Sequence, residues 1–330
     1  MGLTGWLRRH ATPRPLLVTV PGGGAMRLAA ERELRERGWA FASAPAEADL
    51  FVVCGVPGPE LQDAVERVWS ELPSPRARAD IRDEAGAAGA LDRAHARLDD
   101  AEEQRADTQA RGGGGVAELP MADRAPDRDG LVLDQLHVSL GPVLPDWPAG
   151  VALQLTIQGD VVQSAEVEVV GESGVGTSPW VGDARAAALD SVARLLTVCG
   201  CDTAARTARR LRDQLLAGVA DDAELHRFTR RLRRSRTLRW ATDGLGYLEG
   251  TRGDLAGDAT QRWRRWVEVV EQPERSGRPY GGRAERAQVA LEVLPELLEG
   301  QELTAVRVVV ASLDPDLDAL PSTHPQGAQR

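Results

Sequence analysis

The first 75 residues alternate short apolar runs with stretches in which apolar side chains recur at helical spacing. Leu16 to Val20 is a β-rich run, and residues 49–55 form a continuous apolar run ending at glycine, as in a buried parallel strand. Residues 26–37 have helical composition, and residues 59–72 place apolar side chains on one side of a helix. The order strand, helix, strand, helix predicts a small doubly wound α/β domain.

The composition changes from residue 76 to residue 111, where Ala, Arg, Asp and Glu dominate and large apolar residues are few. Such a segment can be helical, but we expect it to bury little surface. Four glycines at residues 112–115 then form a flexible joint. The boundary between two domains is therefore expected in this region.

The second half of the chain begins with a β pattern. Residues 151–158 and 161–170 alternate apolar and polar side chains, and Gly159-Asp160 lies between them, so a β-hairpin is predicted. Residues 183–300 follow a helical pattern that predicts about five helices. The Val-rich run of residues 306–312 predicts a last strand that returns to the core.

These patterns predict an organisation in four parts. In chain order, they are a small doubly wound α/β domain (residues 1–80), a charged, Gly-rich linker (81–130), an α+β domain with a β-hairpin sheet and a helical bundle (131–315), and a flexible tail (316–330).

The overall charge and the cysteine content exclude several classes of protein. The formal net charge is −10, which makes the chain as a whole a poor binder of nucleic acid. Three cysteines do not make a secreted disulfide framework, and we find neither a signal peptide nor a run of the ~20 apolar residues that a membrane span needs. A cytoplasmic protein, soluble or peripheral to a membrane, is expected.

Three glycines follow the first predicted strand and are candidates for phosphate binding: Gly22, Gly23 and Gly24. A Gly-rich turn before a helix can hold a phosphate on its backbone N–H groups. The segment matches neither the P-loop nor the dinucleotide-binding pattern, and the chain has no Lys. A tight strand-to-helix turn is therefore the favoured interpretation.

The pair Cys199 and Cys201 is the candidate for a metal site. A structural metal site usually needs four ligands. The five histidines are scattered along the sequence, so further ligands are poorly supplied. We expect no metal here and interpret the pair as small residues at a junction between helices. Cys54, inside a predicted strand, is expected to be a small buried apolar residue.

The strongest local charge lies between residues 227 and 239. Its candidate docking residues for a partner or a membrane are Arg230, Arg231, Arg233, Arg234 and Arg236. The alternative is a solvated helix that pairs with the acidic residues 81–105. Trp263 and Trp266 share one face of a later helix, where core packing is favoured over a partner interface.

Residues 18–75 carry a family likeness. Ala42 to Pro57 reads ASAPAEADLFVVCGVP, and Ala64 to Trp69 reads AVERVW. This arrangement resembles the small, iron–sulfur-bearing subunit that complex I (its B-type subunit) shares with membrane-bound nickel–iron hydrogenases. In that family a Gly-Cys-x-x-Cys loop follows the first strand, whereas Pro21 to Gly24 stands here. A cluster needs four thiolates or close substitutes, so no cluster is expected.

The start of the second domain carries another likeness. Leu140 to Gly150 reads LGPVLPDWPAG and is followed by the hairpin with Gln158-Gly159-Asp160. It resembles the opening of the D-type subunit of complex I, or the hydrogenase large subunit, with its phrase GPQHPSTHG. The first histidine of that phrase, which lies near the quinone site in complex I, matches Leu144, and the second histidine is also missing.

A third likeness lies near the C-terminus, where Val308 to Pro315 reads VVVASLDP. This phrase resembles the end of the hydrogenase large subunit, in which Ser-Leu-Asp-Pro leads into a Cys-x-x-Cys that holds nickel. The matching positions here are Asp316 and Ala319. Neither side chain supplies the thiolate that such a metal needs.

Together the resemblances imply a degenerate fusion of a small-subunit-like and a large-subunit-like part, with the cofactor cysteines missing from both. The implied function is that of a non-catalytic structural subunit in a complex-I-like or hydrogenase-like membrane assembly. It would occupy the place of the electron-transfer subunit pair, at the inner face of the cell membrane. Its expected partners are membrane subunits of a complex-I-like or antiporter-like assembly and an anionic membrane surface, without nucleic acid and without a cofactor.

Two alternatives remain open from the sequence. The chain could still assist electron transfer of the NADH–quinone or hydrogenase type, so its enzymatic status is open, although a non-enzyme is favoured. It could instead be a soluble protein that binds a nucleotide or phosphate through the Gly-rich loop.

Overall fold

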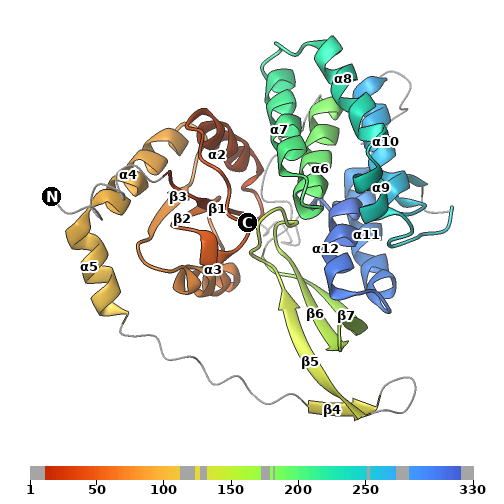
Figure 1. Ribbon diagram of the computed structural model, residues 1–330, viewed down its shortest axis with the longest axis horizontal. Helices are drawn as coiled ribbons and strands as arrows, with labels where there is room; N and C mark the ends of the chain where they lie inside the picture. The colour runs from red at the N-terminus through yellow and green to blue at the C-terminus, as the bar shows by residue number, and fades with distance from the viewer. Residues whose placement is uncertain are drawn as a thin grey trace, which may run out of the picture.

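The computed structural model describes most of the chain. It covers residues 12–111, 123–126, 132–171, 179–180, 183–250, 253–272 and 282–320. Figure 1 shows an N-terminal α/β unit, a long β-hairpin sheet and a group of helices packed beside both. The fold therefore combines a parallel sheet, an antiparallel sheet and many helices.

The N-terminal unit is built on a three-stranded parallel sheet in the order β1-β2-β3. Its strands are β1 (Pro15–Thr19), β2 (Leu50–Cys54) and β3 (Ala77–Ile81). In the register, Leu16 lies opposite Phe51, and Phe51 lies opposite Arg78. The two strands predicted in this part of the sequence are confirmed, and β3 is an additional one.

Helices cover both faces of this sheet. The helices are α2 (Gly24–Glu36), the short 3-10 helix η1 (Pro45–Glu47), α3 (Pro59–Glu71), α4 (Ala87–Asp99) and α5 (Ala101–Ala110). Leu17 and Val52 point toward α2 and α4, because alternate residues of a strand face opposite sides. Leu16 and Phe51 point the other way and pack with Leu61 of α3. The predicted helices at residues 26–37 and 59–72 are confirmed.

The expectation that residues 76–111 bury little surface is wrong. Ile81 of β3 and Leu91 and Ala94 of α4 are fully buried in the core that α4 shares with α2. Small alanine side chains, which a search for large apolar residues overlooks, make up much of this core beside Ile81, Leu91 and Leu98. Residues 81–111, expected to belong to a linker, thus complete the α/β unit, while the Gly-rich joint at residues 112–115 lies outside the described residues.

The second sheet is antiparallel, in the order β4-β5-β6-β7. Its strands are β4 (Asp123–Pro126), β5 (Val132–Leu140), β6 (Val151–Gln158) and β7 (Val161–Val169). The predicted hairpin is confirmed as β6 and β7, joined at Gly159-Asp160. The inward side chains of β6, among them Leu153 and Leu155, form a core with the two C-terminal helices.

Where about five helices were predicted between residues 183 and 300, the described residues of this region form six, and one more follows. They are α6 (Ala184–Val198), α7 (Asp202–Leu216), α8 (Asp222–Arg233), α9 (Arg236–Thr242), α10 (Ala259–Glu271), α11 (Arg283–Leu298) and α12 (Leu303–Leu313), with 3-10 turns at Gly253–Leu255 (η2) and Leu317–Ala319 (η3). Trp263 and Trp266 of α10 are buried against α6, as the core interpretation predicted. None of the helices in the described ranges combines the length and the apolarity needed to span a bilayer.

The strand predicted at residues 306–312 is wrong, because this run is helix α12. A short, continuous apolar run does not distinguish a buried strand from a buried helix. In α12, Val308 faces the α6–α10 core while Val309 and Val310 face the sheet core, so the helix is apolar on almost every side. Just before the helix starts, Glu302 forms an isolated β-bridge to Val161, and the neighbouring residues 300–303 exchange backbone hydrogen bonds with residues 160–162.

The flexible tail predicted from residue 316 is also wrong for its first residues. Leu317 is buried in the core beneath the second sheet, and the turn η3 contacts α11. Residues 321–330 lie outside the described part of the chain.

Candidate functional site

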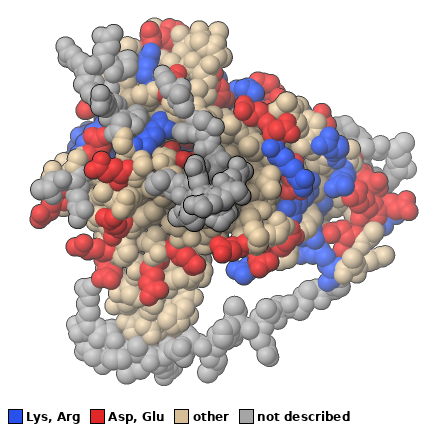
Figure 2. Space-filling model, turned by 180° about the vertical axis from the view of Figure 1, so that it is seen from behind, with Lys and Arg blue, Asp and Glu red and all other residues tan. Residues whose placement is uncertain are grey.

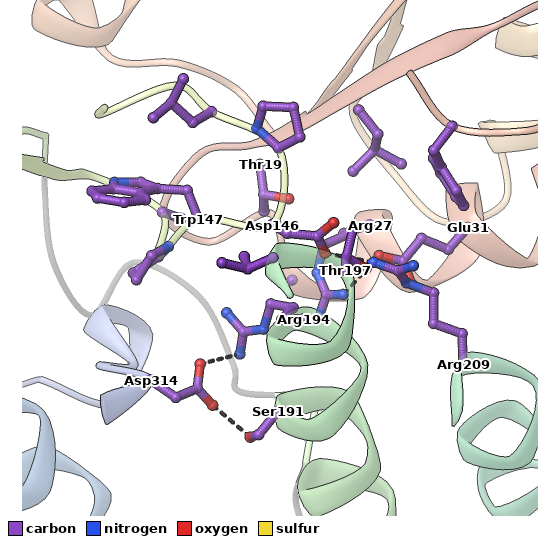
Figure 3. A pocket seen from close by; sticks show the side chains of 18 of the residues that line it. Thr19, Arg27, Glu31, Asp146, Trp147, Ser191, Arg194, Thr197, Arg209 and Asp314 are labelled. Carbon is purple, nitrogen blue, oxygen red and sulfur yellow. Dashed lines mark hydrogen bonds and ion pairs between the residues drawn. The ribbon is translucent and has the colours of Figure 1, made fainter. Parts of the chain in front are cut away.

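A cleft of about 640 Å³ lies where the α/β unit meets the helical part. It is lined by the start of α2, the loop of residues 144–149, α6 and α7, the first turn of α11, and residues 314–318 after α12. Figure 3 shows side chains from these distant segments pointing toward one another across the cleft. A volume of this size is within the range of sites for small molecules.

Three segments meet at one edge of the cleft. The backbone N–H of Gly22 donates to Oδ1 of Asp318, with an N···O distance of 2.7 Å. Gly150 lies beside both, since a methyl group on it would lie 2.9 Å from Cγ of Pro21 and 3.3 Å from Cδ1 of Leu317. The Gly-rich loop, the loop before β6 and the C-terminal turn are therefore in direct contact.

The Gly-rich loop is tightly packed. The N–H of Gly22 is already bonded to Asp318, and the N–H of Gly23 donates to the carbonyl of Val20. A methyl group on Gly23 would lie 2.1 Å from the carbonyl oxygen of Cys54, so only glycine lets the turn approach β2. Gly24 lines the cleft at the start of α2. These contacts favour the tight-turn interpretation over a free phosphate loop.

A buried ion-pair network joins α2 of the α/β unit to α6 and α7. Arg27 of α2 bonds both oxygens of Asp190 on α6, at 3.0 and 2.8 Å, and bonds Glu31 at 2.8 Å. Arg212 of α7 bonds the same two carboxylates through one nitrogen, Nη1, at 2.7 Å to Glu31 and 2.6 Å to Asp190. The side chain of Arg212 has no exposed surface.

The charges in this network stabilise one another. Burial alone would raise the pKa of Glu31, but the charges of Arg27 and Arg212 outweigh it and lower the pKa to about 2. Burial also opposes ionisation of Asp190, and Arg27, Arg194 and Arg212 together bring its pKa far below the usual value. Both carboxylates are therefore ionised at neutral pH, and each matches a buried cation.

Further ion pairs extend the network to the rim of the cleft. Arg209 bonds Asp146 at 2.5 Å, and Arg35 pairs with Asp213 on α7. Asp314 accepts from Ser191 at 2.5 Å and from Arg194 at 2.6 Å. The ion pair of Arg194 with Asp314 holds the C-terminal turn against α6, as Figure 3 shows.

Asp316 and Asp318, which follow Asp314 in the chain, lie where ionisation of a carboxyl group is less favourable. Burial raises the pKa of Asp316, and the nearby charges of Asp318 and Asp314 raise it further. Burial raises the pKa of Asp318 as well, although the N–H of Gly22 partly offsets this. The nearest cation to Asp316 is Arg283, at 3.6 Å.

The cysteines are not among the residues that line the cleft, although Val198, Gly200 and Asp202, beside Cys199 and Cys201, do line it. Cys54 is fully buried in β2, which raises its pKa. Cys199 and Cys201 lie at the junction of α6 and α7, where burial raises the pKa of Cys199 to about 12 and also raises that of Cys201. All three are therefore thiols near neutral pH. The described residues contain no group of three or more His, Cys, Asp or Glu side chains placed to hold a metal ion.

The docking arginines predicted on α8 and α9 lie on the surface. Arg230, Arg231, Arg233, Arg234 and Arg236 are all exposed. Arg233 pairs with Glu271 at 2.9 Å, whereas no ion pair of the other four appears among the described residues. The predicted alternative, pairing with residues 81–105, is not seen in the described structure, and Figure 1 places α8 and α4 on opposite sides of the molecule.

Charge elsewhere on the surface is mixed. Figure 2 shows acidic and basic side chains interspersed over the face opposite to that of Figure 1. Next to the docking arginines, Trp240 at the end of α9 is 85% exposed, the largest exposure among the big apolar side chains described. This surface thus combines an exposed Trp with four arginines for which the described residues show no ion pair.

The buried network was not predicted from the sequence. The best signal for it was Asp190, a lone carboxylate within the apolar run Ala186–Val192 of α6. Leu144, at the position that matches a family histidine, does line the cleft.

Comparison with models of protein families, with curated proteins and with solved structures finds no match to this chain.

Proposed function

We propose that the chain is a non-catalytic structural subunit of a complex-I-like or hydrogenase-like membrane assembly, where it occupies the place of the electron-transfer subunit pair. One observation carries the proposal. A single cleft is lined by three segments that are more than 100 positions apart in the chain, around Gly24, Leu144 and Asp316. Each of them resembles a cofactor or quinone segment of these subunits. Chance likenesses of short phrases have no reason to meet in space.

The side chains at the matching positions are the second support. Gly24 stands in the loop that carries cluster cysteines in the small subunits, and Leu144 stands where a histidine lies near the quinone. Asp316 stands where a nickel ligand lies in the hydrogenases. Carboxylate, glycine and leucine are poor ligands for the soft metals of that family. In this proposal the cleft corresponds to the junction between the two subunits, without the side chains that hold their cofactors.

In this proposal the α/β unit is the doubly wound, small-subunit-like part, and the hairpin sheet with its helices is the large-subunit-like part. The buried network of Arg27, Glu31, Asp190 and Arg212 then replaces the contact between two separate subunits. A scaffold must keep its parts in a fixed relation, and several buried ion pairs with matched geometry favour one arrangement over others.

The exposed arginines of α8 and α9 are the proposed contact with the membrane or a membrane subunit, at its cytoplasmic face. An arginine near an anionic bilayer contributes about 1 kcal/mol. Trp240 supports the assignment, because the amphipathic indole ring favours the interface between headgroups and hydrocarbon.

The test is to purify the chain from its native host after gentle detergent extraction and to identify its partners by mass spectrometry. Iron and nickel are measured in the same sample. Antiporter-like membrane subunits, with no metal on this chain, would support the scaffold. Stoichiometric iron or nickel would favour the alternative in which the chain assists electron transfer, and a lone soluble protein would overturn the assembly.

A further inference from the structure

The cleft contains guanidinium groups whose hydrogen-bonding capacity is not used. Buried Nε atoms without a hydrogen-bond partner occur on four described arginines, and all four line the cleft: Arg194, Arg209, Arg286 and Arg307. A buried donor without a partner costs about 1–3 kcal/mol. The Nε atoms of Arg194 and Arg209 still lie 3.5 Å from Asp190 and 3.6 Å from Glu31. Those of Arg286 and Arg307 have no such carboxylate among the described residues, which indicates a place that a ligand completes.

Two of these four arginines, Arg286 and Arg307, also have no carboxylate partner among the described residues. Arg194 pairs with Asp314, and Arg209 pairs with Asp146. Arg286 and Arg307 form no ion pair in the described part of the chain, and each bonds only a backbone carbonyl. Nη2 of Arg286 donates to Leu313 at 3.3 Å, and Nη2 of Arg307 donates to Pro145 at 3.0 Å.

Several carboxylates that line the cleft are already engaged with other groups. Glu31 is shared among three arginines, Asp316 lies by Arg283 and Asp318 accepts from Gly22. They are therefore not placed to neutralise Arg286 and Arg307. The half-buried setting of both arginines makes an unmatched cation costly, so a matching anion would be stabilising.

The two arginines come from different helices. Arg286 lies in the first turn of α11, and Arg307 lies midway along α12. Each side chain is held by its hydrogen bond to the carbonyl of Leu313 or Pro145. The other N–H groups of each guanidinium group remain available to a ligand. A guanidinium group presents paired N–H donors that match the oxygens of a phosphate or a carboxylate.

We propose that the cleft binds a small anion with more than one phosphate or carboxylate group, and that Arg286 and Arg307 are its principal ligands. Arg194 and Arg209 line the same cleft, but their Nε atoms face Asp190 and Glu31. The cavity of about 640 Å³ accommodates such an anion with its organic body, against the apolar surfaces of Trp147 and Phe41. This site does not use the Gly-rich loop and does not depend on the scaffold role.

The test uses isothermal titration of the full-length chain with inorganic pyrophosphate and, separately, with citrate, at constant ionic strength. Saturable binding of one equivalent of either anion is expected, and the stronger of the two identifies the phosphate or the carboxylate class. Arg286→Gln and Arg307→Gln should each weaken binding at least about tenfold. Arg105→Gln, an exposed arginine of α5 away from the cleft, should bind as the parent does.

The lysine variants separate ligand binding from folding. Arg286→Lys and Arg307→Lys keep the charge and lose the paired donors, so their affinity should fall between those of the parent and the glutamine variants. Thermal unfolding of every variant identifies those that fold. No saturable binding of either anion to the parent would overturn the proposal. Unchanged affinity in folded Arg286→Gln and Arg307→Gln variants, or an equal loss in Arg105→Gln, would overturn it as well.

Discussion

Arg27 and Asp190, 163 positions apart in the chain, form a two-pronged ion pair across the junction between the α/β unit and the helical part, at 2.8 and 3.0 Å. Asp190 is 1% exposed, and its second partner Arg212 has no exposed surface. Charges buried this deeply are tolerated only when each is matched. The two halves of the molecule are therefore expected to fold as one cooperative unit.

Asp190→Asn should be strongly destabilising. The substitution keeps the size of the side chain but leaves Arg27 and Arg212 with one fewer counter-charge in a buried site. Removing one partner of a buried pair costs about 3–5 kcal/mol. Denaturant unfolding followed by circular dichroism measures the loss. The matched control is Glu271→Gln, which removes the partner of the more exposed Arg233 and should cost less than about 1 kcal/mol. Equal losses in the two variants would contradict the role given to the network.

Stability should fall steeply in acid because of the same network. Burial raises the pKa of Glu31 and of Asp190, but the surrounding arginines more than offset it, so that the pKa of Glu31 is lowered to about 2 and that of Asp190 is lowered further. A carboxylate with a lowered pKa stabilises the fold above its ordinary pKa, and this contribution is lost as pH falls toward the folded value. Unfolding free energies between about pH 5 and pH 2 should therefore decrease more in the parent than in the double variant Glu31→Gln/Asp190→Asn. Parallel curves would show that other groups control acid unfolding.

Asp316 should behave in the opposite way. Its pKa is raised by burial and by the charges of Asp318 and Asp314, so ionisation at neutral pH destabilises the fold. Asp316→Asn should increase stability near pH 7 by up to about 1 kcal/mol, and the gain should vanish once acid protonates the parent residue. Asp314→Asn is the contrasting variant, because Asp314 bonds Ser191 and Arg194 and its loss should destabilise. A loss of stability in Asp316→Asn at pH 7 would show that Arg283 is the stronger influence.

The sequence predicted the parallel strands β1 and β2, the helices α2 and α3, and the β6–β7 hairpin, because each has a clear apolar period. It did not predict α12, since a Val-rich run buried on nearly all sides lacks a helical period. It missed the contribution of α4, where Ala90 and Ala94 fill the core beside Leu91 and Leu98. Local pattern fails where burial is complete or where side chains are small.

The cleft was predictable only in part. The phrases around Gly22, Leu144 and Asp316 were chosen from the sequence, and all three segments line it. The arginines that line the cleft were not predicted from the sequence. The chain has 40 basic residues, all of them arginine, and the sequence does not distinguish those in the cleft from the many on the surface. Only the fold separates Arg286, held at a carbonyl inside the cleft, from Arg105 on the surface.

Gly23 should not accept a side chain. Its Cβ would lie 2.1 Å from the carbonyl oxygen of Cys54, inside the β1–β2 layer. Because backbone has to move to relieve this contact, Gly23→Ala should cost at least about 1–3 kcal/mol by denaturant unfolding. Gly58→Ala is the matched control, since nothing lies within 4 Å of its Cβ position and its φ of −68° suits alanine. A neutral Gly23→Ala variant would show that the loop is looser than its contacts indicate.

The arginine surface of α8 and α9 should bind anionic membranes. Vesicles of phosphatidylcholine with about 30% phosphatidylserine are expected to bind the chain in low salt and to release it as ionic strength rises, because surface charges are screened. Replacing Arg230, Arg231, Arg234 and Arg236 by glutamine should lower the affinity at least about a hundredfold, at about 1 kcal/mol for each arginine that reaches the surface. Trp240→Ala should weaken binding less and leave the salt dependence intact, since the indole contributes through apolar contact.

The control replaces three exposed arginines of the α/β unit, Arg82, Arg93 and Arg105, and should retain binding. Equal losses in the two sets would mean that overall charge rather than this surface attracts the membrane, and binding to neutral vesicles alone would exclude an electrostatic dock.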